Sequence, residues 1–280
     1  MFSSVPVPRQ PRGSEPPPEV RRRRWIHLGT WAALLLLVGL SFQGSELNVA
    51  QLISGTGNSW RYIFGTPDQP NSGFFPPDFS KGALYFSQML LTVKMAVLGT
   101  VGAVLLALPL GVLAARNTTP NRWAYQLTRR LLDFLRGLNE FVLALIFVAA
   151  VGLGPFPGIL ALVFHTAGIL GKLFAEGIED IDEGQVEAVR ATGAHPLSVL
   201  GRGVWPQILP HVLSMSMYRF ESNVRAATVL GLVGAGGIGF YITEAIRGFD
   251  TRAASAILII ILLSVFSIDF LSAKLRARLQ

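Results

Sequence analysis

The stretch that decides the fold runs from Glu187 to Gly193 and reads Glu-Ala-Val-Arg-Ala-Thr-Gly, and Pro206 follows it after an amphipathic segment. Two long apolar runs flank this region. The pattern predicts two short helices joined at a glycine, held on a loop between membrane spans where another protein can bind. We therefore interpret it as a coupling element and not as an active site.

Local signals place the ends of the two helices. Asp182 with Gln185 three positions later resembles a capping box, which predicts a helix from about Glu183 to Thr192. Gly193 suits the position after a helix C-terminus, where φ is often positive, and Pro196 suits the first turn of the next helix. An ordinary surface hairpin would show the same signals. The prolines beyond the second helix favour the coupling interpretation.

The composition is that of an integral membrane protein. Hydrophobic residues make up 51% of the chain and charged residues 15%, and the mean hydropathy is +0.47. The apolar residues gather in blocks about as long as a bilayer crossing. The chain has no cysteine, which excludes disulfides, thiolate metal sites and cysteine nucleophiles. The net charge of +7 comes from basic residues at the ends of apolar runs, so it indicates membrane orientation and not nucleic-acid binding.

Apolar length and charge together predict an all-α membrane protein with about six spans. Each span must be helical, because the bilayer core satisfies no backbone hydrogen bonds. The expected spans cover residues 25–43, 86–114, 131–152, 158–175, 207–233 and 253–272. The first run resembles a signal peptide, but it is nearly span length and no Ala-x-Ala pattern follows it. We interpret it as a retained span.

The basic residues predict the orientation. If both termini are cytoplasmic, one side of the membrane holds Arg21 to Arg24, Arg116, Arg122, Arg129, Arg130, Lys274, Arg276 and Arg278. The other side holds only Arg61, Lys81, Arg247 and Arg252. This distribution places residues 176–203 in the cytoplasm and residues 44–83 outside.

The first 70 residues of the chain hold no motif. Residues 1–24 begin with a stretch rich in Pro, Ser and Gly, and they are expected to form a disordered cytoplasmic tail. Residues 25–83 hold the first span and a polar, turn-rich outer segment. Within it, Phe74 to Phe79 reads Phe-Phe-Pro-Pro-Asp-Phe, which suits an anchor at the membrane interface or a lid over a pathway. We favour the anchor.

The expected fifth span is the most polar one. Tyr218, Glu221 and Arg225 recur at spacings of three and four residues, so they form one stripe along a helix. Arg219 and Asn223 lie on another face. Ionisable side chains at membrane depth usually face a pathway or a partner helix, so these five are candidate pathway residues.

The charged residues of this span differ in their expected partners. Glu221 and Arg225 stand four residues apart with the acid first, and we expect them to pair within the helix. Such a pair either borders a pathway or only fixes helix packing, and the sequence leaves both open. Arg219 has no acidic residue one turn away and is the better pathway candidate.

Polar residues outside the fifth span give weaker signals. Asn139 and Glu140 open the third span as further pathway candidates, where Glu140 either pairs with an arginine of the fifth span or lies at the cytoplasmic surface. Lys94 is expected to extend toward the membrane interface, and His165 to be a hydrogen-bonded histidine inside the bundle.

Two glycine motifs resemble nucleotide-binding sequences without their context. Residues 234–239 match G-x-G-x-x-G, but the strand, helix and acidic residue that such a site requires are missing. A glycine-rich break at the outer end of a membrane helix is the better interpretation. After Gly171 and Lys172, Leu173 stands where a phosphate loop needs Ser or Thr. The chain therefore carries no nucleotide-binding machinery of its own.

At these residues the chain resembles a known family, the permease subunits of binding-protein-dependent ABC importers. The signature of that family on a cytoplasmic loop is E-A-A, three residues, G, nine residues, then I-x-L-P. It falls here on Glu187, Ala188, Gly193 and Pro206. The chain departs from it at Val189, Gly203 and Trp205.

Within the family, the chain is most similar to permeases of phosphonate importers. This likeness is carried by residues 74–79, by Arg136-Gly137-Leu138-Asn139-Glu140 and by residues 218–225. Many relatives have proline at the position of Asn139. Residues 108–113 and 231–239 extend the match, which covers roughly residues 74–272.

The resemblance implies a type I, MetI-like permease domain in residues 84–280, with its coupling loop at residues 176–206, in a bacterial cytoplasmic membrane. It implies a second copy of the chain, two cytoplasmic ATPase subunits that hold ATP and Mg, and a periplasmic or lipid-anchored binding protein. This chain itself is then a conduit in membrane lipid, with no cofactor, no enzymatic activity and no nucleic-acid partner. The implied cargo is phosphonate, with phosphite, hypophosphite or a phosphate ester as alternatives.

Two other classes of function compete with this interpretation. A secondary transporter driven by an ion gradient predicts inverted internal repeats, and none is visible. An intramembrane hydrolase needs a nucleophile with a base, or clustered metal ligands. The four histidines, at positions 27, 165, 195 and 211, lie in separate segments without ligand spacing.

Overall fold

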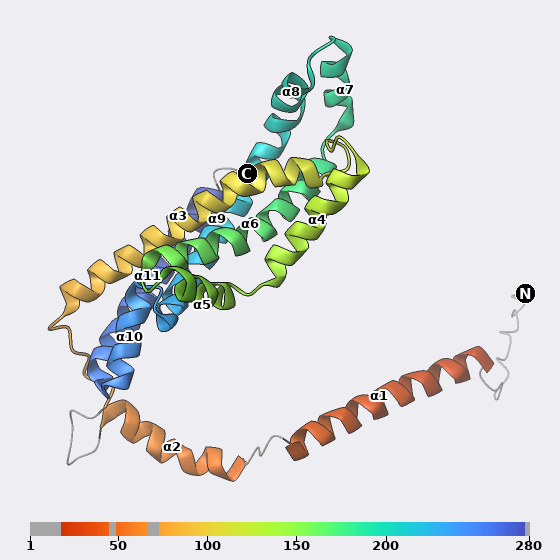
Figure 1. Cartoon of the computed structure of the whole chain (residues 1–280). Coiled ribbons are helices and arrows are strands. Elements are labelled where there is room, and N and C mark those ends of the chain that lie inside the picture. Colours follow the sequence, from red (N-terminus) through yellow and green to blue (C-terminus); the bar gives the residue numbers. More distant parts are fainter. Residues whose placement is uncertain (1–17, 45–48, 66–72, 278–280) are drawn as a thin grey trace, which may run out of the picture. The chain divides into compact units, whose positions relative to one another are not determined.

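The computed structural model describes residues 18–44, 49–65 and 73–277, and all regular structure in them is helical (Figure 1). The chain divides into two compact units, residues 1–59 and 60–280. Residues 1–17 of the tail that we expected to be disordered lie outside the described residues. The all-helical class predicted from the sequence is confirmed.

The first unit consists of α1 (Pro18–Gly44) and the first part of α2 (Val49–Phe64). α1 contains a stretch long and apolar enough to cross a membrane, Arg22–Ser41. It begins before the predicted span, so residues 18–24, which we expected in the tail, are helical. α2 was not predicted, because two glycines in its middle weaken the helical signal of a polar sequence.

The second unit is built around two parallel helices, α3 (Gly82–Ala114) and α6 (Pro155–Glu179). Small residues bring them close together: a Cβ on Gly99 would lie 2.7 Å from the Leu162 Cβ, and one on Gly111 would lie 2.9 Å from the Phe174 Cβ. Apolar side chains gain little from packing in lipid, so close backbone approach through small residues is what holds such helices.

Because α3 and α6 run in the same direction, the chain must cross back between them. It does so in two helices, α4 (Arg122–Gly137) and α5 (Glu140–Val151), which meet at a bend of 87°. The span predicted for residues 131–152 is therefore not one continuous helix but part of a bent pair. The Leu138 N–H bonds the Phe134 carbonyl and ends α4, and the Asn139 side chain accepts the Phe141 N–H at 2.8 Å and starts α5.

The remaining spans agree with prediction. α9 (Trp205–Leu230) runs antiparallel to α6, and a 3-10 turn (Gly231–Val233) leads through a glycine-rich turn into α10 (Ile238–Arg247). α11 (Thr251–Arg276) packs against α9 and α10. The glycine-rich turn has positive φ at Gly234, Gly236 and Gly237, which fits the predicted break and not a dinucleotide site.

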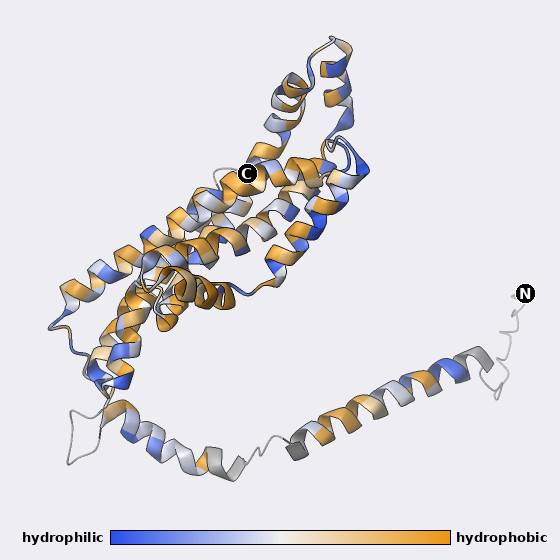
Figure 2. Cartoon of the chain, viewed as in Figure 1, coloured by the Kyte–Doolittle hydropathy of each residue, from blue (hydrophilic) through white to orange (hydrophobic). Residues whose placement is uncertain are grey.

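Among the described residues, four helices are long and apolar enough to span a membrane, and six spans result if each of two bent pairs counts as one. Figure 2 shows hydrophobic residues spread along α3, α6 and α11, and hydrophilic ones at the start of α4 and on α7. Both the class of integral membrane protein and the estimate of about six spans are confirmed.

The aromatic segment of residues 74–79 is hydrogen-bonded to the elements on both sides of it. The N–H groups of Phe74 and Phe75 donate to the carbonyls of Tyr62 and Ile63 at the end of α2, at 3.1 and 2.9 Å. The Asp78 N–H donates to the Arg252 carbonyl at the start of α11. Phe75 is 45% exposed, as an interfacial anchor requires, but the choice between anchor and lid stays a prediction.

Candidate functional site

Two short helices project from the end of the bundle at which α3 and α6 end (Figure 1). α7 covers Glu183–Ala191 and α8 covers Pro196–Val199, after which a π-helical turn (Leu200–Val204) leads into α9. We call residues 182–199 the α7–α8 hairpin. Both predicted helices are present, and Pro196 is in the first turn of the second one, as expected.

The cap of α7 differs from the predicted capping box. The Asp182 side chain does accept a backbone N–H, that of Gly184 at 2.9 Å, but the Gln185 side chain takes no part. Instead Gln207 of α9 accepts the Asp182 N–H at 3.0 Å and donates to the Gly203 carbonyl at 2.7 Å. Gln207 thus accepts the N–H that Gln185 was expected to accept. Because Gln207 belongs to α9, this bond also attaches the hairpin to the first turn of α9.

The turn between α7 and α8 depends on Gly193. Its φ is +74°, which confirms the expected left-handed conformation, and its N–H donates to the Arg190 carbonyl at 3.0 Å. A Cβ there would meet nothing within 4 Å. Glycine is therefore required for its backbone conformation and not for space.

The hairpin has a buried and an exposed side. Val186 and Val199 are 6% exposed and pack in one cluster with Val204 and Ile208. The coupling residues that we predicted from the sequence are all solvent-exposed: Glu187, Ala188, Gly193 and Pro206. The face that carries them is open to another protein.

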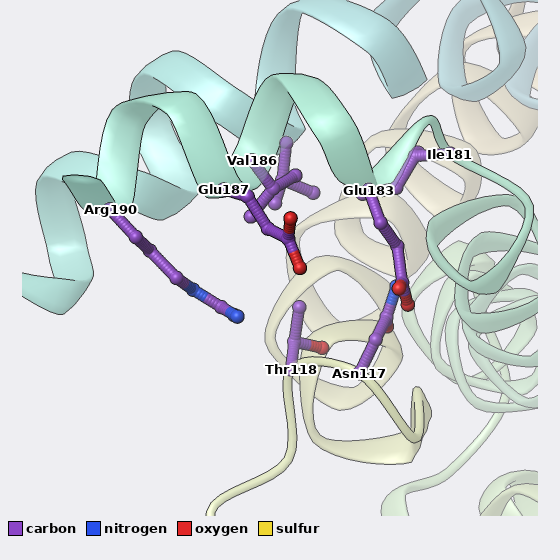
Figure 3. Close-up of a pocket in the computed structure, with 8 residues that line it drawn as sticks. Asn117, Thr118, Ile181, Glu183, Val186, Glu187 and Arg190 are labelled. Atoms are coloured by element: carbon purple, nitrogen blue, oxygen red, sulfur yellow. The ribbon is translucent and has the colours of Figure 1, made fainter.

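A pocket of about 200 Å³ lies between α7 and the loop that follows α3 (Figure 3). In it the Glu183 side chain extends toward Asn117 and the Glu187 side chain toward Thr118. The Asn117 Nδ2 donates to the Ile178 carbonyl at 2.6 Å, which leaves its buried Oδ1 without a hydrogen bond in the described residues. Two carboxylates and this oxygen make the pocket rich in acceptors.

The base of the hairpin is fixed by Arg129 of α4. Its Nη2 lies 2.8 Å from the Glu179 Oε1 at the end of α6, and its Nε donates to the Ala114 carbonyl at the end of α3. The same Glu179 oxygen accepts the Arg116 N–H. Tyr125 accepts a hydrogen bond from the Arg116 side chain and thereby raises the pKa of that guanidinium. The ends of three helices are therefore joined beneath the hairpin.

The charged stripe of α9 pairs with another helix. Glu221 forms an ion pair with Arg276, in which Oε1 and Nη1 are 2.8 Å apart without a hydrogen bond. The Arg225 Nη1 donates a hydrogen bond to the Asp269 Oδ1 at 2.9 Å. The predicted pair within the helix, Glu221 with Arg225, is therefore wrong. α11 runs antiparallel beside α9 and offers each side chain an oppositely charged partner. Asp269 is the single acidic residue of α11, a signal in the sequence that would have pointed to such a partner.

Asn223 is a packing residue in this structure. It is 1% exposed, its Oδ1 accepts the Thr166 hydroxyl of α6 at 2.9 Å, and its Nδ2 donates to the Thr100 hydroxyl of α3 at 2.9 Å. One amide therefore joins the three central helices. These bonds use its side chain inside the bundle, which argues against the pathway role expected of it.

Arg219 stands apart from the other charged residues of α9. Its Nε is buried without a hydrogen bond, and no salt bridge to Arg219 occurs among the described residues. Tyr218 beside it is 53% exposed. An unpaired guanidinium in an apolar helix bundle is costly, which marks Arg219 as the side chain most in need of an anion.

Asn139 and Glu140 lie together at the start of α5, next to α9. With Ser222 and Arg225 they line a cavity of about 380 Å³. Glu140 lies 3.2 Å from the Nε2 of His165, whose Nδ1 is 2.7 Å from the Leu138 carbonyl. The expected hydrogen-bonded histidine is confirmed, but its carboxylate partner was missed, because two residues far apart in sequence meet only at the bend.

The fold and this distribution of polar groups define a multi-pass membrane protein with polar residues along α9 and a projecting α7–α8 hairpin. No group of three or more potential metal ligands occurs in the described residues. Residues 107–280 match the family described as binding-protein-dependent transport system inner membrane component. The chain belongs to this family.

Relatives and a solved structure agree with this assignment. A phosphite transport system permease protein of Stutzerimonas stutzeri is 45% identical over 201 residues, 72% of this chain and 73% of its own. A protein of Escherichia coli K12 named for a cryptic phosphonate transport system is 53% identical over 117 residues, 42% of this chain and 96% of its own. A chain of the MetNI methionine ABC transporter in an inward-facing conformation superposes with a TM-score of 0.64 at 20% identity, covering 72% of this chain and 99% of that one.

The family assignment answers two questions left by the sequence. The chain is the transmembrane component of an ABC transporter, and ATP is hydrolysed by a separate subunit. It is an inner-membrane, multi-pass permease and not a secondary transporter. The fold is similar to that of the MetNI permease, as the resemblance implied.

The pairing across α9 and α11 can be tested with double-mutant cycles. Arg276→Met should lower the stability in detergent on the order of 2 kcal/mol, because it leaves the buried Glu221 carboxylate unpaired. In the Glu221→Gln background the same change should cost much less. Thermal unfolding of the four variants measures this coupling. The matched cycle of Glu221→Gln with Arg225→Met should be additive, and strong coupling there would support the pair within the helix instead.

Proposed function

We propose that this permease forms the translocation pathway of an ATP-driven importer for phosphonate or a related small phosphorus oxyanion. The observation that carries the proposal is Arg219, a guanidinium in a bundle helix with no hydrogen bond or salt bridge in the described part of the chain. Arginine suits a phosphorus oxyanion because its planar fork donates paired hydrogen bonds to two oxygens.

The cavity beside α9 supports the same pathway. It is bordered by the first turn of α5, by the Ser222 hydroxyl and by Arg225. A helix N-terminus presents free N–H groups and a partial positive charge, both of which favour an anion. We assign Tyr218, Arg219, Asn139 and Glu140 to the wall of this route, and we assign Glu221, Arg225 and Asn223 chiefly to holding the helices in place.

Acidic residues near the route limit how tightly an anion is held. Arg225 already has a carboxylate partner in Asp269, and Glu140 lies at the cavity wall. A conduit needs contacts strong enough to admit the ion and weak enough to release it. One free arginine with carboxylates nearby meets both needs better than a cluster of unpaired arginines would.

The names of the relatives support a phosphorus cargo without choosing among its forms. One relative is named for phosphite and another for phosphonate. Both anions carry the tetrahedral, oxygen-bearing phosphorus that a guanidinium binds. Phosphite is therefore the second candidate, and hypophosphite or a phosphate ester remains compatible with the same chemistry.

The assembly that we propose contains two copies of this chain, two ATPase subunits and a binding protein that delivers the anion. The ATPases dock on the exposed face of the α7–α8 hairpin, through Glu187, Ala188 and Gly193, and on the first turn of α9, through Pro206. ATP with Mg is bound in the ATPases and not in this chain. The hairpin side is then cytoplasmic, with both termini on that side, and the α2–α3 segment is outside.

The first prediction concerns uptake by vesicles that hold the assembled transporter. Arg219→Ala should reduce uptake of phosphonate and phosphite about tenfold or more, because the anion loses its charged hydrogen-bond donor. Arg219→Lys should retain part of the rate, since it keeps the charge and loses the fork. Arg130→Ala, an exposed arginine of α4, is the control. Normal uptake by Arg219→Ala at normal assembly would remove Arg219 from the pathway.

The second prediction concerns orientation. The chain has no cysteine, so single cysteines can be introduced at two exposed positions, Gln185→Cys on α7 and Ser80→Cys before α3. In intact cells with a permeable outer membrane, a membrane-impermeant thiol reagent should label only the Ser80→Cys protein. Labelling of Gln185→Cys from outside would reverse the topology.

The third prediction concerns coupling. Gly193→Val should weaken ATPase co-purification and uptake, because a branched residue at φ +74° costs about 1–3 kcal/mol in strain. Gly193→Asn should be milder, because asparagine tolerates the left-handed region. Gly201→Ala tests a glycine with open space and ordinary φ and should have little effect. Full ATPase binding by Gly193→Val would show that the turn geometry does not matter for docking.

A further inference from the structure

Phe249 lies in the turn between α10 and α11, at the end of the bundle opposite the α7–α8 hairpin (Figure 1). Its φ is +54°, and it is the one residue other than glycine with a positive φ in the part of the chain that the structure describes. A residue with a Cβ is disfavoured in this left-handed conformation. Phe249 is also 90% exposed, more than any other large hydrophobic residue that the structure describes. Its ring therefore makes little packing within the chain that would offset the backbone conformation.

The left-handed conformation of Phe249 belongs to the hydrogen-bond pattern that ends α10. The Asp250 N–H donates to the Ala245 carbonyl at 2.9 Å, and the Phe249 N–H donates to the Ile246 carbonyl at 3.2 Å. This pattern is a Schellman motif, in which the residue at the position of Phe249 is usually glycine or asparagine. The chain has a glycine one position earlier, but the φ of Gly248 is −81°, which most residue types can adopt. The sequence thus places phenylalanine at the position of the turn that favours glycine.

The start of α11 fixes the backbone on the other side of Phe249. The Asp250 side chain accepts the Ala253 N–H at 3.0 Å. The Arg252 Nε donates to the Pro76 carbonyl at 2.8 Å. Residues keep a strained backbone only where the surrounding structure determines it, and such residues cluster at functional sites. The Cα–Cβ bond of Phe249 therefore leaves the turn in a direction that both adjoining helices determine.

The residues beside Phe249 in the turn are exposed as well. Arg247 and Asp250 are charged, and Ile246 is a second hydrophobic residue with 59% exposure. Aromatic side chains inside a polar rim are typical of protein–protein contacts, in which a few of them supply most of the binding energy. A ring whose Cα–Cβ direction is already fixed also loses less conformational freedom when a partner binds.

Membrane lipid is the other partner that an exposed aromatic ring can have. Aromatic anchors at the membrane interface are mainly Trp and Tyr, whose polar atoms lie at the level of the headgroups. Phenylalanine has no such polar atom. A fluid lipid layer also gains nothing from a fixed side-chain direction, whereas a protein pocket of fixed shape does. The backbone of Phe249 therefore fits a protein partner better than lipid.

We propose that Phe249 is the principal contact through which the outer face of this permease binds its substrate-binding protein. The ring enters an apolar pocket of that protein, and Arg247 and Asp250 lie at the rim of the contact. The family is described as binding-protein-dependent, so a protein of this kind belongs to the system. The proposal rests on the proposed function, in which the end of the bundle opposite the hairpin faces outside.

Binding of the system's own purified binding protein to the assembled transporter tests the proposal, in detergent and in nanodiscs of phosphatidylethanolamine and phosphatidylglycerol. Phe249→Ala and Phe249→Gly should each raise the dissociation constant about tenfold or more, because both lack the ring. Phe249→Tyr keeps the ring and should stay within about threefold of the wild type. Phe266→Ala is the matched control: it removes an exposed phenylalanine from α11 and should leave the dissociation constant unchanged.

Thermal unfolding separates the ring from the backbone conformation. Phe249→Gly relieves the strain that Phe249→Ala keeps, so the glycine variant should melt about 2 °C or more above the alanine variant. Both variants should bind the binding protein equally weakly. ATPase co-purification checks that each variant assembles.

Three results would overturn the proposal. The first is unchanged binding by Phe249→Gly, and the second is a loss of binding in nanodiscs but not in detergent, which would assign the ring to lipid. The third is an equal melting temperature of the glycine and alanine variants, which would show that the turn stores no strain. Failure of the proposed function looks different: the wild-type transporter would bind its binding protein normally and take up no phosphorus oxyanion.

Discussion

The close, parallel packing of α3 against α6 is the constraint on which the rest of the structure depends. Small residues allow the two backbones to approach, and the Asn223 amide bonds one threonine from each helix. Parallel neighbours require a connection that crosses the bundle, and α4 with α5 provides it at the cost of an 87° bend. That bend places the polar start of α5 beside α9 in the middle of the bundle. A continuous apolar helix would have placed only hydrophobic side chains there.

Among the charged side chains of α9, all but Arg219 have an oppositely charged partner in the part of the chain that the structure describes. A lone charge at membrane depth costs at least about 2.5 kcal/mol, and an unpaired buried ion more. Glu221 and Arg225 avoid this cost through Arg276 and Asp269, and both partners come from α11. Arg219 does not avoid it in the described residues. This difference from the paired charges is why we propose Arg219 as a pathway residue.

The sequence was a good guide wherever the signal was local. Helix positions followed from apolar length, and the positive φ of Gly193 and the place of Pro196 followed from their residue types. It failed where a distant residue took over a local role. Gln207 displaced Gln185 at the cap of α7, and α11 supplied the partners that Glu221 and Arg225 were expected to find in each other. The bend at Asn139 was hidden because residues 131–152 are apolar on both sides of a short polar interruption, and only the bonds of Leu138 and Asn139 divide them. The orientation and the roles of the individual pathway and coupling residues stay predictions.

The hydrogen bond between Gln207 and Asp182 attaches the α7–α8 hairpin to the first turn of α9, so that a force on the hairpin acts on α9. α9 continues as a helix through Pro210 to Leu230, so a torque applied at its first turn reaches residues deep in the bundle. Side-chain tips lie about 5–6 Å from a helix axis, so a turn of about 20° moves them by about 2 Å, enough to break or form a hydrogen bond. Arg219 lies about 18 Å from Gln207 along the same helix. A small rotation of the α7–α8 hairpin would therefore change which groups Arg219 can reach. Movement of the ATPase would then be coupled to the transported anion by rotation of α9, without any large opening of the bundle.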